Sequence, residues 1–225
     1  VAAFIDRRTA GKNDPPTGGL GFFDCITDQE AASELFDHCK AWLEEKGMEA
    51  MDGPINFGER HEWWGLLVDG FYEPNYCMPY NYPYYKDLFE NYGFKLYFKQ
   101  FTFHRPVEGG LSDKVLMKAE KVLQDPDYSF SPIDKSKLSL ITEDFRTVYN
   151  KSWGKHSGVS EISSSQARAL FKKLKPILDP NLLWFAFYKN EPVAFFLMIP
   201  ELNQIFRHMN GKMHLVNKLR FLYYQ

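Results

Sequence analysis

This chain contains few cysteines, and its net charge is small. Cys25, Cys39 and Cys77 are an odd number of cysteines, and they form neither a CxxC pair nor a Cys/His spacing typical of metal ligands. We therefore expect reduced thiols, a cytoplasmic protein and no metal site. The net charge over 225 residues is only −2. This overall balance indicates no nucleic-acid partner and no broad affinity for an anionic membrane.

Long hydrophobic runs and familiar catalytic signatures are also absent from the sequence. The longest apolar run, from Pro192 to Pro200, has the length of a strand, so no integral membrane segment is expected. No GxSxG, P-loop or kinase signature occurs. No signal peptide is visible, but the chain begins at Val1 inside an expected strand. We therefore expect that an upstream portion precedes it.

Aromatic residues, in contrast, are abundant: the chain has 20 Phe and 13 Tyr. Such a supply is typical of a sheet packed against helices, or of a wide apolar groove. In the first half, hydrophobic periodicity predicts strands over 1–5, 20–26 and 48–55 and helices over 29–46 and 85–92. Asp28 is expected to cap the first helix, whose apolar face carries, at steps of three and four, Ala32, Leu35, Phe36, Cys39, Trp42 and Leu43. The glycine-rich PPTGGLG at 15–21 is expected to be a loop, with a phosphate cradle as the other interpretation.

The pattern is interrupted and then restarts in the second half of the chain. A charged helix is expected over about 111–124, and Pro126 and Pro132 follow it in a linker. The pattern that restarts at Leu138 predicts helices over 142–153 and 164–174 and strands over 182–188 and 193–199. A turn at Lys189, Asn190 and Glu191 is expected to join these two strands. We therefore expect an α/β protein with two domains, 1–125 and 126–225.

The most distinctive segment is NYPYYKDLFENYGFKLYFKQFTF, residues 81–103. It predicts a short helix, a stop at Gly93 and a long aromatic strand. One face of that helix carries Tyr85, Leu88, Phe89 and Tyr92. The segment resembles the helix-to-strand passage near the C-terminal end of the acyl-CoA N-acyltransferase (GNAT) fold, where a pattern of the type N…LYEKLGF lies beside the acyl-CoA.

This resemblance implies a mixed, mostly antiparallel central sheet flanked by helices. Val1 to Ile5 is similar to Val193 to Leu197, and in the GNAT fold a hydrophobic strand of this kind precedes the central cofactor strand. The expected arrangement is therefore the C-terminal part of a first GNAT-like unit over 1–125 and the N-terminal part of a second over 126–225. Tandem units of this kind occur in N-myristoyltransferases and in transferases that add amino acids to cell-wall peptides.

The resemblance also implies a reaction, the transfer of an acyl or aminoacyl group to a small-molecule or peptide amine. The implied donor is an acyl-CoA, with a charged tRNA as the other possibility for an aminoacyl group. In many family members a Tyr of the motif protonates the leaving thiolate. That position is Phe89 here, so the neighbouring Tyr84, which lies off the apolar helix face, is the expected acid.

The densest polar cluster lies in GPINFGERHEWWGLLVDGF, residues 53–71. A His beside carboxylates and an Arg can act as a base or clamp a substrate carboxylate. We expect Glu59 or His61 to act as the base. Substrate binding is expected from Asn56, Arg60, Trp63, Trp64 and Tyr85. The other interpretation of the cluster is a solvated loop that its two tryptophans anchor.

An alternative function is a catalytically degenerate GNAT-like module that binds a ligand or a protein in an aromatic cleft. The family holds the CoA pyrophosphate on a Q/R-x-x-G-x-G/A loop at a helix N-terminus. The helix that follows Asp28 has no such loop, and this difference favours the alternative. The basic and aromatic stretch after Gln204 is expected to be a partner-binding or membrane-surface helix, or an amphipathic segment with a solvated face.

Overall fold

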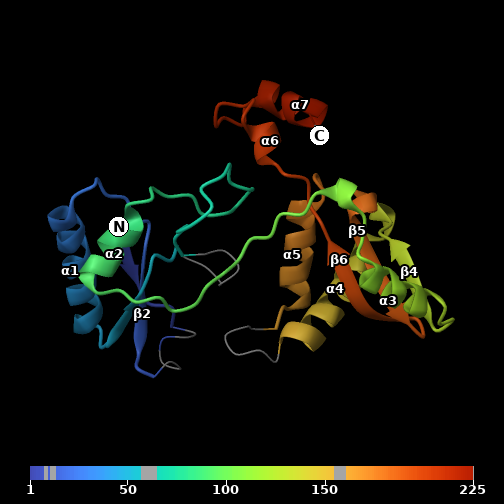
Figure 1. Ribbon diagram of the computed structural model, residues 1–225, viewed down its shortest axis with the longest axis horizontal. Helices are drawn as coiled ribbons and strands as arrows, with labels where there is room; N and C mark the ends of the chain where they lie inside the picture. Colours follow the sequence, from blue (N-terminus) through green and yellow to red (C-terminus); the bar gives the residue numbers. More distant parts are fainter. Residues whose placement is uncertain (8–9, 11–13, 57–64, 155–160, 225) are drawn as a thin grey trace. The chain divides into compact units, whose positions relative to one another are not determined.

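A computed structural model of the chain describes residues 1–7, 10, 14–56, 65–154 and 161–224. The chain divides into two compact units, Val1–Phe103 and His104–Gln225, and Figure 1 labels most of their helices and strands. The sequence placed this division after residue 125. The difference arises because helix α3 (Asp113–Leu123) contacts strand β4 (Tyr128–Pro132) and so belongs to the second unit.

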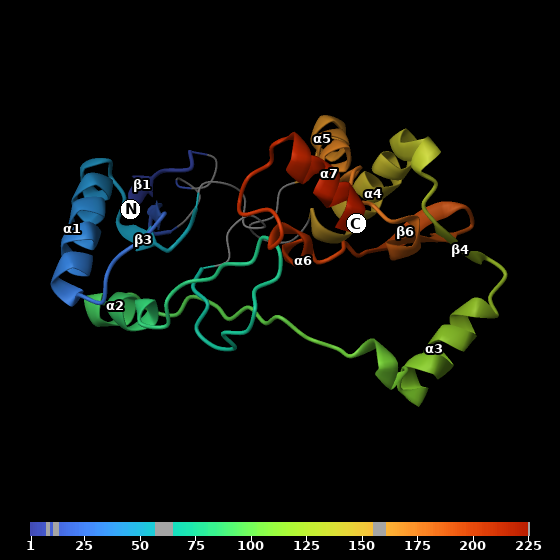
Figure 2. The ribbon, with the colours of Figure 1, turned by 90° about the horizontal axis from the view of Figure 1, so that it is seen from above.

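The first unit contains a three-stranded sheet and two helices. Its strands are β1 (Ala2–Phe4), β2 (Thr17–Gly21) and β3 (Ala50–Asp52), and its helices are α1 (Gln29–Glu45) and α2 (Tyr85–Tyr92). Strand β2 is central; it pairs antiparallel with β1 and parallel with β3. Helix α2 lies against the start of α1 (Figure 2), where Nε2 of Gln29 donates to the carbonyl oxygen of Leu88 at 3.2 Å.

Both helices of the first unit begin or end where local sequence signals predicted. The Asp28 carboxylate caps α1 by accepting from two backbone amides, and Ala32, Phe36, Cys39 and Leu43 form its buried face at steps of three and four. Gly93 ends α2 with a φ of +119°, a conformation that favours glycine. The side chain of Phe36 stacks on Phe23 and meets Phe89 edge-on, which joins the two helices in one aromatic core.

The glycine-rich stretch, predicted to be a loop or a phosphate cradle, is instead the central strand β2. Ile55 runs beside this strand, and its backbone N–H donates to the carbonyl oxygen of Leu20 at 2.6 Å. A Cβ added to Gly21 would collide with the carbonyl oxygen of Ile55, and one added to Gly18 would collide with the side chain of Leu43. These glycines therefore permit close packing, and the predicted strand over 20–26 was wrong beyond Gly21.

The aromatic strand predicted after Gly93 is also wrong. Residues 94–103, all of which the structure describes, form no strand, and Tyr97 and Phe103 are 71% and 88% exposed. Residues with β-type side chains form a strand only where a neighbouring strand takes up their backbone hydrogen bonds. The described residues supply no such neighbour to this segment.

The second unit contains an antiparallel sheet in the order β4-β5-β6, formed with β5 (Leu183–Tyr188) and β6 (Glu191–Leu197). The turn between β5 and β6 carries Lys189 and Asn190 at positive φ, as expected for a tight hairpin. Strand β4 lies in the segment that was expected to be a linker, because Tyr128–Pro132 pairs with β5 along its length.

Helices α4 (Leu138–Trp153) and α5 (Ser164–Leu174) cover one face of this sheet (Figure 1). Phe145 on α4 meets Phe171 on α5 and Phe195 on β6, with ring centroids 5.2 and 4.8 Å apart. Two short helices follow, α6 (Asn203–Phe206) and α7 (Leu215–Tyr224), and single 3-10 turns occur at Val107–Gly109, Lys135–Lys137 and Pro180–Leu182. The described residues thus form a mixed α/β protein, as predicted.

Candidate functional site

A pocket of about 340 Å³ opens in the first unit, beyond the end of β2 and beside the start of α2. Its wall combines apolar and aromatic side chains with polar groups. The lining residues are Phe22, Phe23, Pro54, Asn56, Gly65, Leu66, Cys77, Met78, Pro79, Tyr80, Asn81 and Tyr85. Two residues that the sequence predicted to bind substrate, Asn56 and Tyr85, are therefore in this wall.

Asn56 is held so that its amide nitrogen remains available to a ligand. The backbone N–H of Phe22 donates to the side chain of Asn56 at 2.9 Å, and because an N–H can only donate, the acceptor is Oδ1. Nδ2 of Asn56 then donates to no other residue that the structure describes. Asn56 is an exposed side chain at the pocket. It can offer an oriented hydrogen-bond donor to a carbonyl oxygen.

Asn81 lies in the same wall, but its amide is used within the protein. Oδ1 accepts from the backbone N–H of Leu67 at 2.8 Å, and Nδ2 donates to the carbonyl oxygens of Leu67 and Tyr82 at 3.1 and 2.9 Å. The side chain thus joins the two irregular segments that form the pocket wall. This role of Asn81 could not be predicted from the sequence, because loop residues carry no periodicity that would indicate which of them face one another.

Tyr85 contributes a ring to the pocket and a hydroxyl to the interior. This hydroxyl donates to Oδ1 of Asp24 at 2.7 Å and accepts from the backbone N–H of Cys25 at 3.2 Å. Burial, and then the hydrogen bond to Asp24, raise the pKa of Tyr85 to about 12. The phenol therefore stays protonated and positions the chain before α1, and only its ring is free to contact a ligand.

Tyr84, the predicted acid, also has its hydroxyl engaged. The hydroxyl donates to the carbonyl oxygen of Cys25 at 2.8 Å. Tyr84 is not among the described residues that line the pocket. The structure therefore gives Tyr84 a contact that ties α2 to the segment before α1.

The predicted base and most of the predicted substrate-binding residues lie outside the described residues. These are Glu59, Arg60, His61, Trp63 and Trp64, within residues 57–64. The two residues that flank this stretch, Asn56 and Gly65, both line the pocket.

Cys77 is a second lining residue that sequence analysis did not single out. It is exposed, it is a free thiol, and its backbone has a φ of +63°. The neighbouring Tyr76 shares a hydrogen bond with the Cys77 side chain, and this contact together with partial burial raises the pKa of Tyr76. The proximity of Cys77 to Asn56 follows from the tertiary structure alone, since 21 positions separate them in the sequence.

The N-terminus of α1 is the place where the GNAT resemblance would put a pyrophosphate. Oδ1 of Asp28 accepts from the backbone amides of Glu30 and Ala31 at 2.9 and 3.1 Å. The amides that would hold an anion at this helix end are therefore already satisfied by a carboxylate, whose charge also repels phosphate.

Within the described part of the chain, no His, Cys, Asp and Glu side chains come together in a group that could hold a metal ion. No helix there combines the length and the apolar character needed to cross a membrane.

Comparison with known proteins identifies two distant relatives. The chain is 23% identical over 222 residues to protein YghO of Escherichia coli, a match that covers 95% of the chain and 54% of that protein. It is also 23% identical over 215 residues to a bacterial ceramide synthase of Caulobacter vibrioides, covering 95% of the chain and 56% of the relative. The chain thus spans about half the length of these relatives. No family model and no solved structure matches it.

Proposed function

We propose that this chain is part of an N-acyltransferase that moves an acyl group from a CoA-type donor to an amine. The observation that carries the proposal is the similarity to a bacterial ceramide synthase over 95% of the chain. A ceramide is the amide of a fatty acid with the amino group of a sphingoid base, so its synthesis is an N-acylation. The proposed substrate class is accordingly a long-chain acyl donor and an amine with a lipid-like tail.

The pocket in the first unit supports this reaction. In acyl transfer the amine attacks the thioester carbonyl carbon, negative charge develops on the carbonyl oxygen, and the C–S bond then breaks to release a thiolate. A donor aimed at that oxygen stabilises the transition state. Nδ2 of Asn56 is such a donor, because Phe22 fixes the orientation of the amide. Phe22, Phe23 and Leu66 in the same wall are the side chains that would contact an acyl chain.

The amine must lose a proton in this reaction, and the thiolate must gain one. We assign the base to Glu59 or His61, which lie between the pocket-lining residues Asn56 and Gly65 in the sequence. The base takes the proton from the attacking amine and returns it to the departing thiolate, so the proton balance closes without a separate acid. Arg60, Trp63 and Trp64 are the proposed substrate contacts in the same stretch.

The second candidate function is a non-catalytic module that binds a lipid-like ligand in the same pocket. The specific observation in its favour is the Asp28 cap, which occupies the amides at the N-terminus of α1 where the resemblance would place the donor pyrophosphate. In this alternative the pocket binds the acyl chain or the amine, and no bond is made.

Thermal unfolding with added ligands separates the two candidates. We expect stabilisation by a long-chain acyl-CoA below its micelle concentration, with free CoA and acetyl-CoA as matched controls for the nucleotide and the short acyl group. A ligand at one hundred times its Kd adds about 2.7 kcal/mol to the free energy of unfolding. Mass spectrometry of the same mixture with a sphingoid base then looks for the N-acyl product.

The outcomes are distinct. Stabilisation by acyl-CoA together with product that Glu59→Gln or His61→Asn lowers about 100-fold supports the transferase. Stabilisation by the fatty acid or the sphingoid base, with no product, supports the binding module. Stabilisation by none of these ligands contradicts both candidates.

A further inference from the structure

The C-terminal hairpin, defined as residues 203–224 with α6 and α7, has one side that is firmly packed. Phe221 of α7 packs with Ile205 and Met209 in a small buried cluster. Nδ2 of Asn217, which is 3% exposed, donates to the carbonyl oxygens of Met209 and Lys212, both at 2.7 Å. These contacts fix the rotation of α7 about its own axis and therefore decide which of its faces points outward.

The outward face of α7 is apolar. Successive helical residues are rotated by about 100°, so the side opposite Asn217 and Phe221 spans an arc of about 120°. Every residue on that arc is a large hydrophobic side chain that is more than half exposed: Leu215, Val216, Leu219, Leu222 and Tyr223. The exposed fractions of Leu219 and Tyr223 are 62% and 83%.

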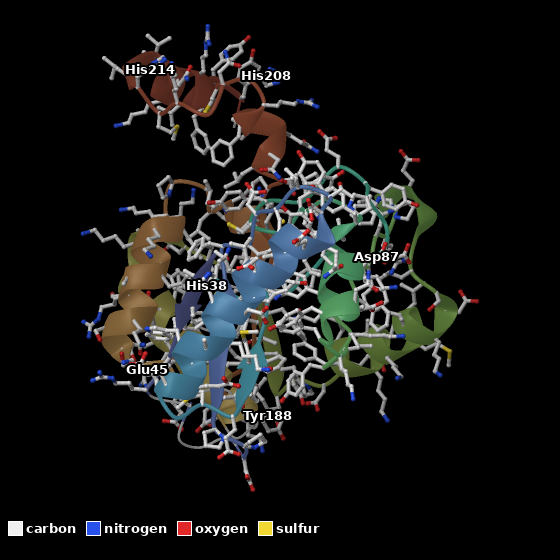
Figure 3. The ribbon with its side chains drawn as sticks, turned by 90° about the vertical axis from the view of Figure 1, so that its left-hand side faces the viewer. His38, Glu45, Asp87, Tyr188, His208 and His214 are labelled. Atoms are coloured by element: carbon white, nitrogen blue, oxygen red, sulfur yellow. The ribbon has the colours of Figure 1, made fainter. Side chains whose placement is uncertain are left out.

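Cationic side chains border this apolar face on both sides. On the same helical projection, the position of Lys218 lies beside one edge of the arc and that of Arg220 beside the other. In the structure Nη1 of Arg220 donates to Oδ1 of Asn217 at 3.4 Å, so this side chain would turn towards the headgroups on binding. Arg207 and Lys212 add two further cations, and residues 203–224 contain no Asp or Glu. The overall charge of −2 thus conceals a local cluster of a single sign. Figure 3 labels His208 and His214, which mark the connection between α6 and α7.

An apolar helix face with cations at its edges is typical of helices that bind lipid surfaces. A helix that lies on a lipid surface inserts an apolar face at the boundary of headgroups and acyl chains, and long cationic side chains at its edges reach back to anionic headgroups. Tyrosine is also favoured at that depth, because its ring is apolar and its hydroxyl is polar.

Helix α3 provides an internal comparison. It also exposes large apolar residues, among them Met117 and Leu123. Its charges are mixed, however, since Asp113 and Glu120 lie among its lysines. Exposure of apolar residues is therefore common to α3 and α7, whereas charge of a single sign is specific to the hairpin.

We propose that α7 docks this chain on an anionic lipid surface, with Leu219 at the centre of the inserted face and Lys218 and Arg220 against the headgroups. The inference does not depend on the proposed acyl transfer, because it concerns the other unit and needs no catalysis. A surface-bound position would, in addition, bring the chain to where lipid-like substrates reside.

Vesicle flotation tests the proposal directly. The chain is mixed with vesicles of phosphatidylcholine alone, or of phosphatidylcholine with phosphatidylglycerol, at low and high salt. We expect binding to the phosphatidylglycerol vesicles, little binding to pure phosphatidylcholine, and weaker binding at high salt because the headgroup charges are screened.

Two variants and one matched control assign the binding to α7. The double variant Lys218→Gln, Arg220→Gln should bind about 30-fold more weakly, since each cation near an anionic surface contributes a factor of about five. Leu219→Glu should weaken binding at least about tenfold. Leu123→Glu on α3 changes an equally exposed leucine, 67% against 62%, and should leave binding unchanged. Circular dichroism checks that each variant is folded.

Three results would overturn the proposal. The first is no binding to anionic vesicles, or equal binding to neutral ones. The second is equal loss of binding in Leu123→Glu and Leu219→Glu. The third is a dimer in light scattering that Leu219→Glu dissociates while vesicles stay unbound, since a second copy of the chain would then cover this face.

Discussion

The backbone N–H of Phe22 donates to Oδ1 of Asn56 at 2.9 Å, across 34 positions of sequence. Phe22 follows the end of β2 with a φ of +50°, and Asn56 comes shortly after β3. The bond therefore joins the ends of two neighbouring parallel strands and turns the Asn56 amide so that Nδ2 donates to none of the residues that the structure describes. This relationship makes Asn56 the residue through which the proposed function can be tested most directly.

Asn56→Asp should separate function from folding. An aspartate carboxylate can still accept from the Phe22 N–H, but it offers no donor at the position of Nδ2. We expect the free energy of unfolding to change by less than about 0.5 kcal/mol. If Asn56 stabilises the oxyanion, kcat for N-acyl transfer should fall about 100- to 1000-fold. Urea denaturation and a product assay measure the two quantities; unchanged kcat would remove Asn56 from the proposed mechanism.

Asn81→Asp, in contrast to Asn56→Asp, should lower the free energy of unfolding. Both Nδ2 bonds of Asn81, to the carbonyl oxygens of Leu67 and Tyr82, would be replaced by contacts between oxygens. We expect a loss of about 1–3 kcal/mol in the free energy of unfolding, because these acceptors lose their partner. Urea denaturation measures this loss. Equal stability of the two variants would contradict the finding that Nδ2 of Asn81 is used within the protein whereas Nδ2 of Asn56 donates to no described residue.

Tyr84→Phe tests the predicted acid. The variant loses the hydrogen bond to the Cys25 carbonyl oxygen, so the free energy of unfolding should fall by about 1 kcal/mol. Because that hydroxyl is engaged away from the pocket, kcat should remain that of the wild type at a temperature where both proteins are folded. A fall of kcat by about 100-fold would restore Tyr84 as the acid that protonates the thiolate.

Gly21→Ala should be strongly destabilising. The added Cβ would collide with the carbonyl oxygen of Ile55, and backbone on both sides of the contact would have to move. We expect a loss of about 3 kcal/mol in the free energy of unfolding. Gly109→Ala is the matched control, since a Cβ there meets nothing within 4 Å, and its effect should stay within about 0.5 kcal/mol. Similar midpoints of thermal unfolding for the two variants would contradict the close packing described for β2.

Stability should decrease at alkaline pH because of Tyr85. Its pKa in the folded protein is about 12, whereas the unfolded value is about 10. The folded state therefore holds the phenolic proton more tightly. The resulting stabilisation is fully present below pH of about 10 and is lost as the pH rises towards about 12. In Tyr85→Phe this pH dependence should be shallower. An unchanged slope of unfolding free energy against pH would assign the alkaline loss to other groups, Tyr92 first, whose pKa is also raised to about 12.

Several elements of this protein could be predicted from the sequence, because their signals are local. The Asp28 cap and the spacing of Ala32, Phe36 and Leu43 predicted α1, and Gly93 predicted the end of α2. The turn at Lys189 and Asn190 was predicted in the same way. At the Asp28 cap and at Gly93 the backbone groups concerned are satisfied by residues within a few positions, so no knowledge of the remaining chain was needed there.

Part of the candidate site was also accessible from the sequence. Asn56 and Tyr85 were expected to bind substrate, and both line the pocket. Their hydrogen-bond partners, Phe22 and Asp24, could not be predicted, because they lie 34 and 61 positions away. The substrate-binding roles of Asn56 and Tyr85 stay predictions. So do the roles expected of Glu59, Arg60, His61, Trp63 and Trp64, which are outside the described part of the chain.

The sequence by itself determined the presence of α1 to α5, the cap of α1 and the end of α2, the hairpin in the second unit and the amphipathic character of the C-terminal stretch. Only the tertiary structure decided that Thr17–Gly21 is a strand, that residues 94–103 are not, and that Asn217 turns the apolar face of α7 outward. The physical reason is the same in each case. A strand requires a neighbour for its backbone hydrogen bonds, and an exposed face requires a buried one opposite it. Both depend on contacts between residues that the sequence does not place side by side.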